Sequence, residues 1–240
     1  MKPTYSVIIP AYNEQDWLSR SLPIAHEATE AQAEPSEIIV VDNNSSDRTA
    51  QVAQTLGARV VFEPINQISR ARNTGASAAT GDYLIFLDAD TLLPSDLLQA
   101  AIGRLSTGQC VGGGAWIRAD QPIGLPARIL VWGWNRFSWW WGSAAGCFFY
   151  CRRDAFEAVG GFSQRLYASE ELWLSRALRI WGRANGMRFE VITEPPVITS
   201  ARKLNHPKNV VLWLLVLLFP LSIFSRKLCA FWYARPGSRR

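Results

Sequence analysis

The sequence is poor in cysteine, with four residues among 240. Four scattered cysteines are too few for a disulfide framework, and Cys147 and Cys151 lack the C-x-x-C spacing and second cluster of a zinc site. We therefore expect free thiols in a reducing compartment. An apolar signal segment is also missing in front of the first strand pattern, which begins at Tyr5. We interpret the protein as facing the cytosol.

A long uninterrupted apolar run is also lacking, although 48% of the residues are apolar. The densest run, 210–224, has Pro220 inside it and falls short of the roughly 20 residues that cross a bilayer. We expect this segment to lie on or re-enter a membrane, with the basic residues that follow it on anionic lipid. A buried core helix is the alternative. The net charge of +5 does not indicate nucleic-acid binding. The basic residues flank an apolar helix and do not form a row on a polar face.

Short apolar runs alternate with longer helix-like stretches in the first hundred residues. The runs at 6–9, 37–41, 58–62 and 83–87 are typical of strands, and the stretches 14–33, 47–56 and 69–79 are long enough for helices. This rhythm predicts an α/β fold, with a Rossmann-like, mostly parallel sheet covered by helices on both faces. Ligands bind beyond the carboxyl ends of such strands. Polar clusters follow three of the four runs, at 13–14, 42–47 and 88–90, and we expect them to form one rim.

Asp88 and Asp90 directly follow the apolar run 83–87. Side chains at i and i+2 of an extended backbone point to the same side, so the two carboxylates are expected to share one hard cation. Proteins commonly hold Mg²⁺ or Mn²⁺ with one or two carboxylates when the ion also binds a nucleotide diphosphate. The alternative is that the pair only ends a strand and caps the helix that starts near Pro94.

Five segments together resemble the family 2 glycosyltransferases, which have the GT-A fold. They are S-V-I-I-P-A-Y-N-E (6–14), I-I-V-V-D-N-N-S-S-D-R-T (38–49), S-R-A-R-N-T-G-A (69–76), L-D-A-D (87–90) and G-G-F-S-Q-R-L-Y-A-S-E-E-L-W-L-S-R-A-L-R (160–179). Their order and spacing are those of the family, over about the first 200 residues. Asn43 departs from the pattern, since the family often has a second Asp there.

The resemblance implies a nucleoside diphosphate sugar as the donor, with a UDP-sugar favoured, and Mg²⁺ or Mn²⁺ as the cofactor. The residues that it places around the donor are Pro10, Tyr12, Glu14 and Asp42 at the base and ribose, Arg72 and Asn73 near the diphosphate or sugar, Asp88 and Asp90 at the ribose and metal, and Arg202 with Lys203 at the diphosphate. A solvated loop is the competing account of Arg202 and Lys203. His206 is a weaker candidate for a third metal ligand.

Transfer to a hydroxyl needs a group that takes the acceptor's proton. The candidates are Glu170 and Glu171, at the start of a helix that is expected to run to about Trp181 and to stop at Gly182. In the resembling family an Asp at the position of Glu171 is the base, and Glu171 keeps the carboxylate on a longer side chain. A purely structural alternative has Ser169 as the N-cap and both acids in a favourable first turn.

Residues 129–149 hold five tryptophans, where the family places acceptor-binding elements. We expect Trp139, Trp140 and Gly146 to contact the acceptor, because exposed aromatic clusters stack on sugars or pack against lipid chains. An aromatic core layer is the alternative.

The sequence thus predicts a nucleotide-sugar-binding and catalytic GT-A domain at 1–205 and a membrane-associated apolar and basic tail at 206–240. The expected activity is metal-dependent, inverting transfer of a sugar to a hydrophobic or lipid-linked acceptor, at the cytoplasmic face of the membrane, by a peripheral or monotopic protein. A nucleotidyltransferase is one alternative, although the Gly-rich, Arg- or Lys-bearing loop that it needs after the first strand is missing. A non-catalytic membrane scaffold that retains the fold is the other.

Overall fold

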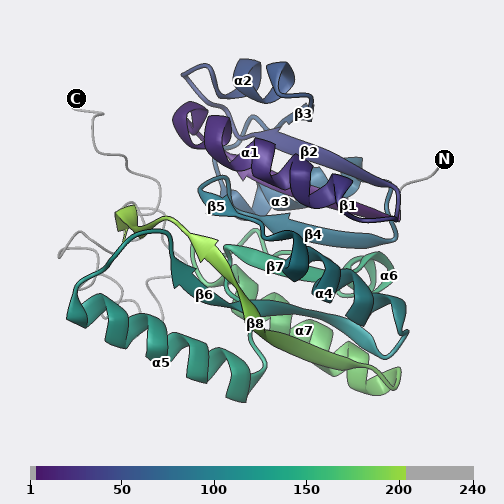
Figure 1. Cartoon of the computed structure of the whole chain (residues 1–240). Coiled ribbons are helices and arrows are strands. Elements are labelled where there is room, and N and C mark those ends of the chain that lie inside the picture. The colour runs from purple at the N-terminus through teal and green to yellow at the C-terminus, as the bar shows by residue number, and fades with distance from the viewer. Residues whose placement is uncertain (1–3, 204–240) are drawn as a thin grey trace.

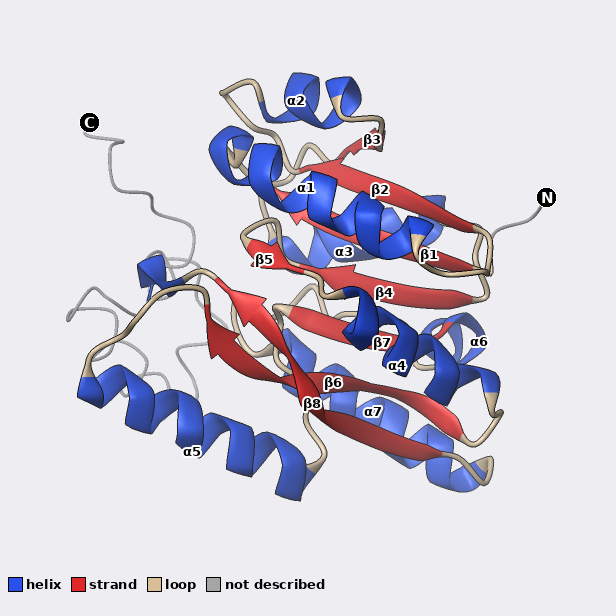
Figure 2. Cartoon of the chain, viewed as in Figure 1, coloured by secondary structure: helices blue, strands red, loops and turns tan. Residues whose placement is uncertain are grey.

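The computed structural model describes residues 4–203, apart from the side chain of Lys203. An eight-stranded sheet in the order β3-β2-β1-β4-β7-β6-β8-β5 runs through the molecule, and helices lie in front of and behind it (Figures 1 and 2). The described chain ends in a short 3₁₀ turn, Ala201–Lys203. The apolar run 210–224, Cys229, His206 and the predicted boundary at 205/206 lie outside the described residues.

The first four predicted strands are present and lie next to one another. They are β1 (Tyr5–Ala11), β2 (Ser36–Asp42), β3 (Arg59–Phe62) and β4 (Tyr83–Leu87). All are parallel, with β1 between β2 and β4 and β3 outside β2. Their carboxyl ends therefore meet at one edge, which is where the polar clusters were expected to gather.

The prediction of a mostly parallel sheet holds for the first four strands, whereas the second half of the chain adds antiparallel pairs and makes the sheet mixed. Strand β7 (Phe148–Arg152) runs antiparallel to β4, and β6 (Cys110–Ala119) runs antiparallel to β7. Strand β8 (Arg188–Thr199) then pairs in parallel with β6 and antiparallel with the two-residue β5 (Thr91–Leu92). Because β7 is antiparallel to β4, its first residue, Phe148, lies beside Leu87, and the loop before β7 reaches the carboxyl end of β4.

The two faces of the sheet have separate apolar clusters. On one face, α1 (Gln15–Glu30), α2 (Thr49–Thr55) and α4 (Ser95–Ser106) cover side chains such as Val7 and Ile85. On the other, α3 (Ile68–Ala78), α6 (Arg153–Ala158) and α7 (Glu170–Ala184) cover Ile8 and Phe86. The predicted early helices are confirmed, whereas α7 continues through Gly182, where the sequence suggested that it stops. The remaining helix, α5 (Leu125–Trp141), lies at the rim of the sheet in Figure 2.

Close packing of α3 on the sheet fixes the position of one arginine of the site. A Cβ on Gly75 would lie 2.4 Å from Ile8 Cγ2 and 2.9 Å from Val41 Cγ2, so only glycine lets α3 approach β1 and β2 this closely. Arg72, one turn earlier on α3, is thereby held beneath the end of β4.

Three cysteines are described, and all are free thiols. Cys110 and Cys151 are buried, which raises the pKa of the Cys110 thiol to about 11 and that of Cys151 still further. The expectation of free thiols is therefore confirmed for the three cysteines that the structure describes. Within residues 4–203, no helix combines the length and the apolar character that crossing a membrane requires.

Candidate active site

A turn after β4 carries the two aspartates. The Thr91 N–H donates to the Asp88 carbonyl (3.0 Å), so 88–91 form a turn and the strand ends at Leu87. Neighbouring elements hold this turn: Asp88 N–H donates to Cys147 O, and Ser21 Oγ donates to Ala89 O. The expected extended backbone was therefore wrong, and the carboxylates face different arginines.

Arg72 is the centre of one group of charges. Its guanidinium donates to Asp88 Oδ1 (2.9 Å), to Glu170 Oε1 (2.6 Å) and to the carbonyl of Gly146 (2.7 Å). The side chain is 2% exposed, and a buried guanidinium of this kind needs carboxylates beside it to offset its lost hydration. Arg72 therefore brings the D-x-D turn, the start of α7 and the loop before β7 to one place.

The two adjacent glutamates at the start of α7 have different surroundings. Glu170 is buried and ion-paired with Arg72, whereas Glu171 is only half-buried. Burial, and then the neighbouring carboxylate of Glu170, raise the pKa of Glu171 to about 8. A Cβ on Gly146 would lie 3.0 Å from Arg72 Nη2 and 3.7 Å from Glu171 Cδ, so Gly146 lies close to both side chains. Glu170 thus has a structural partner, and Glu171 has the surroundings of a general base.

Arg202 forms a second group of charges at the other side of the turn. It contacts Asp90 Oδ2 from Nε (3.1 Å) and Nη2 (2.7 Å), and Nη2 also donates to Glu14 Oε1 (2.6 Å). The Ser200 N–H donates to the Asp90 carbonyl (3.0 Å). Three predicted site residues from distant parts of the sequence, Glu14, Asp90 and Arg202, therefore meet.

The loops after β1 and β2 form the part of the rim that was predicted for the nucleotide. Pro10 and Ala11 lie beside Val41 and Asp42 in the parallel register. Asp42 is buried, and its Oδ1 accepts the Ser45 N–H (3.0 Å). Tyr12 follows directly in the loop after β1. Pro10, Tyr12 and Asp42 are thus neighbours at one end of the sheet.

Sequence analysis placed 13–14 and 42–47 in the polar rim, but it did not show which of their side chains hold the loops, and it missed Gln67. Asn13, at a φ of 50°, accepts the Ser46 N–H through its side chain (2.7 Å), while its own N–H donates to Ser45 Oγ (2.9 Å). Gln67 donates to the carbonyls of Gln164 (2.8 Å) and Leu166 (2.9 Å), which ties α3 to the loop before α7. The run N-N-S-S after a strand is a signal for such a loop, whereas nothing in the sequence identifies Gln67.

Asn73 lies next to Arg72 on α3, but its side chain binds protein backbone. Its Nδ2 donates to the Phe162 carbonyl (2.8 Å), and its Oδ1 accepts the Phe162 N–H (2.9 Å). These bonds fasten the Gly160–Phe162 turn to α3. Contact of Asn73 with a donor sugar remains a prediction.

The aromatic stretch divides into an exposed helix and a buried strand. On α5, Trp139 is 56% and Trp140 is 79% exposed, whereas Phe148 and Phe149 on β7 are buried. The exposed tryptophans of α5 fit the expected aromatic surface, and the buried phenylalanines of β7 fit the alternative of an aromatic core. Gly146 lies in the charged site through its carbonyl, while Trp139 and Trp140 lie on the outer helix.

Asp88 and Asp90 fit the requirements of a nucleotide-bound divalent ion. Both supply only hard oxygen donors, and two carboxylates are the number with which proteins commonly hold Mg²⁺ that also binds phosphates. Within residues 4–203, no group of three or more His, Cys, Asp or Glu side chains is arranged to hold a metal.

The fold resembles that of solved glycosyltransferases. The mannosyltransferase PcManGT of Pyrobaculum calidifontis, solved with GDP-Man and Mn²⁺, superposes with a TM-score of 0.65 over 88% of this chain and 63% of that chain, at 22% identity. Glucosyl-3-phosphoglycerate synthase of Mycobacterium tuberculosis, solved with Mn²⁺, UDP-glucose and phosphoglyceric acid, gives 0.62 over 98% and 81%, at 19% identity. The architecture is therefore that of a GT-A glycosyltransferase.

Sequence comparison is more specific than the fold. The family model "Glycosyl transferase family 2" matches residues 6–160, so the chain belongs to this family and is a glycosyltransferase. The undecaprenyl-phosphate 4-deoxy-4-formamido-L-arabinose transferase of Edwardsiella ictaluri is 37% identical over 128 residues, which are 48% of this chain and 37% of that protein. Glycosyltransferase AglE of Haloferax volcanii is 34% identical over 122 residues, or 47% and 39%. The matched part thus spans well under half of these relatives.

Proposed function

We propose that this protein transfers a sugar from a nucleoside diphosphate sugar, preferably a UDP-sugar, to a lipid-linked acceptor, with inversion at the anomeric carbon. The observation that carries the proposal is the contact of Arg72 with both Asp88 and Glu170. Through Arg72, the proposed metal ligand Asp88 lies in the same site as Glu170, the residue next to the candidate base. The name of the relative that acts on undecaprenyl phosphate supports a lipid-linked acceptor.

In this proposal Asp88 and Asp90 hold Mg²⁺ or Mn²⁺, which when bound neutralises charge on the leaving diphosphate. Asp42, with Pro10, Tyr12 and Glu14 beside it, binds the base and ribose. Arg72 keeps Asp88 and the start of α7 in place.

Different residues are proposed to act on the acceptor hydroxyl and on the leaving diphosphate. Glu171 accepts the proton of the attacking hydroxyl, and Gly146 lies beside this carboxylate. Arg202, which the structure pairs with Asp90 and Glu14, lies where it can turn to the diphosphate.

Thermal unfolding with a panel of nucleoside diphosphate sugars, with and without Mn²⁺, tests the donor and the metal together. A ligand that binds only the folded state at 100 times its Kd stabilises it by about 2.7 kcal/mol. We expect a rise in Tm with a UDP-sugar that requires Mn²⁺. Stabilisation by a nucleoside triphosphate alone would instead favour the nucleotidyltransferase, and no stabilisation by any nucleotide would favour the scaffold.

We also propose that the protein works at the cytoplasmic face of the membrane. The full chain is expected to sediment with anionic vesicles, and each basic side chain near such a surface contributes about 1 kcal/mol. Binding should therefore weaken as NaCl is raised from 50 to 500 mM, because salt screens charges on the surface. Equal sedimentation with zwitterionic vesicles would show that the basic residues do not direct the attachment.

A further inference from the structure

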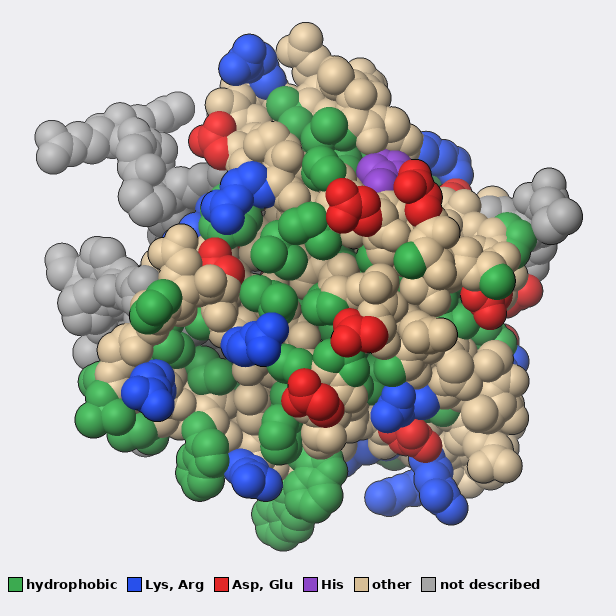
Figure 3. Space-filling view, in the orientation of Figure 1, with side chains coloured by type: hydrophobic (Ala, Val, Ile, Leu, Met, Phe, Trp, Pro, Cys, Tyr) green, Lys and Arg blue, Asp and Glu red, His purple; other side chains and the backbone are tan. Residues whose placement is uncertain are grey.

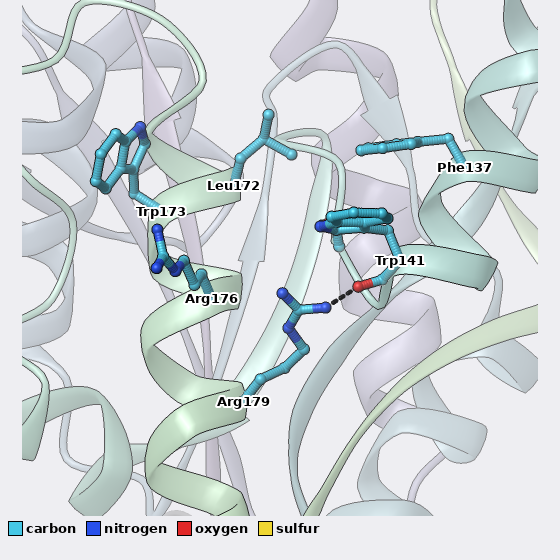
Figure 4. Close-up of a pocket in the computed structure, with 7 residues that line it drawn as sticks. Phe137, Trp141, Leu172, Trp173, Arg176 and Arg179 are labelled. Carbon is cyan, nitrogen blue, oxygen red and sulfur yellow. Dashed lines mark hydrogen bonds between the residues drawn. The ribbon is translucent and has the colours of Figure 1, made fainter.

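A cavity of about 190 Å³ lies between α5 and α7, outside the charged site described above. Phe137 and Trp141 of α5 face Leu172 of α7 across it, with Trp173 and Arg176 on the α7 side (Figure 4). Arg179 reaches across from α7 and donates a hydrogen bond to the Trp141 carbonyl. The cavity thus combines aromatic and aliphatic walls with two guanidinium groups.

The arginines of this part of α7 have no carboxylate partners. Arg176, Arg179 and Arg183 stand three and four residues apart, so they share one side of the helix. None of the three forms a salt bridge in the part of the chain that the structure describes. Burial, followed by the charges of Arg183 and Arg176, lowers the pKa of Arg179. Like charges at this spacing destabilise a helix, and a bound anion would remove that cost.

The neighbouring helix presents an apolar surface. Of its 17 residues α5 buries only Ala127 and Ser138, and its exposed apolar side chains include Trp132, Trp140 and Trp141. Figure 3 shows hydrophobic side chains, with Lys and Arg among them, projecting at the lower left of the molecule, where α5 lies in Figure 1. An exposed patch of this composition is typical of a binding surface.

This surface has a fixed orientation. Asn135 accepts the Ile117 N–H (2.9 Å) and donates to the Ile117 carbonyl (3.0 Å), which fastens the inner side of α5 to β6. The tryptophans on the outer side are therefore held outward and beside the arginines of α7.

We propose that the cavity is the seat of the phosphate head group of a lipid acceptor, and that the outer tryptophans of α5 lie along its hydrocarbon chain. A long-chain phosphate is the ligand chemistry that suits both guanidiniums without a salt bridge among the described residues and aromatic walls. Leu172 and Trp173, which line the cavity, belong to the first turn of α7, the turn that also carries Glu171, so the cavity lies at the same end of this helix as the candidate base. The proposal rests on the proposed function and adds to it the place where the acceptor binds.

Calorimetric titration of the full chain with farnesyl phosphate tests this seat. We expect wild type to bind farnesyl phosphate more tightly than inorganic phosphate or farnesol, because only the first has both parts. The R176Q/R179Q protein should bind it at least tenfold more weakly, since it lacks two charged hydrogen-bond donors for the phosphate. A matched double variant, R59Q/R104Q, removes two arginines from other surfaces and should bind like wild type.

A second variant tests the same cavity independently, in case R176Q/R179Q does not fold. Trp173→Ser changes a half-exposed side chain and should also weaken farnesyl phosphate binding. All variants should keep the Mn²⁺-dependent binding of a UDP-sugar. If the donor assignment is wrong, the wild type itself will not bind a UDP-sugar, so the two proposals can fail independently. Unchanged affinity of R176Q/R179Q, or equal binding of inorganic phosphate or farnesol, would overturn the proposal. Loss of binding to phosphatidylglycerol vesicles alone would make the surface a membrane contact and would also overturn it.

Discussion

The Asp90→Ala protein is expected to fold normally and to lose nearly all Mn²⁺-dependent binding of a nucleoside diphosphate sugar. The loss is large because Asp90 supplies one of only two carboxylates proposed for the cation, and a charged contact is worth about 1.5–3 kcal/mol, or roughly 10- to 100-fold in affinity. Asp88→Ala should behave similarly, although it also removes a partner of buried Arg72. Titration calorimetry with and without Mn²⁺ measures the effect.

Asp154→Asn is the matched control, because Asp154 is an exposed carboxylate paired with Arg152 on another surface. It should bind donor and metal like wild type. If well-folded Asp90→Ala keeps its affinity in Mn²⁺, the assignment of the metal to this turn is refuted.

Glu171→Gln is expected to slow transfer by roughly 10² to 10⁴, the usual contribution of general base catalysis, with donor binding retained. Adjacent helical residues diverge by about 100° around the axis, so Glu170 and Glu171 do not face the same point. Glu170→Gln should instead lower thermal stability, because it leaves the buried guanidinium of Arg72 with one carboxylate fewer. A loss of transfer confined to Glu170→Gln would show that the base was assigned to the wrong carboxylate.

The dependence on pH separates a base from a merely structural residue. With a pKa of about 8, Glu171 is mostly protonated at pH 6, so the transfer rate of wild type should rise from pH 6 to 8 and then level off. The Gln variant should lack this rise. If the acceptor's nucleophile is an already ionised phosphate, no base is needed, and Glu171→Gln should keep most of its turnover.

The same shift predicts an effect on stability. The folded chain holds a proton on Glu171 up to about pH 8, whereas the unfolded chain releases it near 4.5. The stabilising proton is therefore lost as the pH rises through 8, and wild type should lose stability relative to Glu171→Gln between pH 5 and 8. Thermal melts across this range measure the difference.

The first half of the fold was predictable because β1, β2 and β4 are largely buried on both faces and therefore have continuous apolar runs. The second half was not, because β6 contains Gly112, Gly113 and Gly114 in place of an apolar pattern. A Cβ on Gly113 would lie 1.7 Å from the Glu190 carbonyl oxygen, so close approach of β8 requires glycine there. Strand β8 contains two prolines, which also argue against a strand in sequence reasoning.

The candidate site was predictable in its residue types but not in its pairings. The sequence places D-x-D, the glutamates and the late arginine in separate motifs. Arg72 and Glu170 are 98 residues apart, and Asp90 and Arg202 are 112 apart, so only the folded chain shows which carboxylate each arginine neutralises. The ion pair of Glu170 with Arg72 also gives a physical difference between Glu170 and Glu171, which the motif distinguishes only by resemblance.

The contact between Arg202 and Asp90 links donor binding to the far end of the described chain. A divalent cation at Asp90 would compete with Arg202 for the negative charge of this carboxylate, and Arg202 belongs to the turn from which residues 204–240 continue. Such competition is a coupling free energy, and couplings between binding equilibria are reciprocal. The Arg202–Asp90 ion pair therefore weakens metal binding by the same factor by which bound metal weakens the ion pair. A partner that stabilises this pair would lower the affinity for the metal.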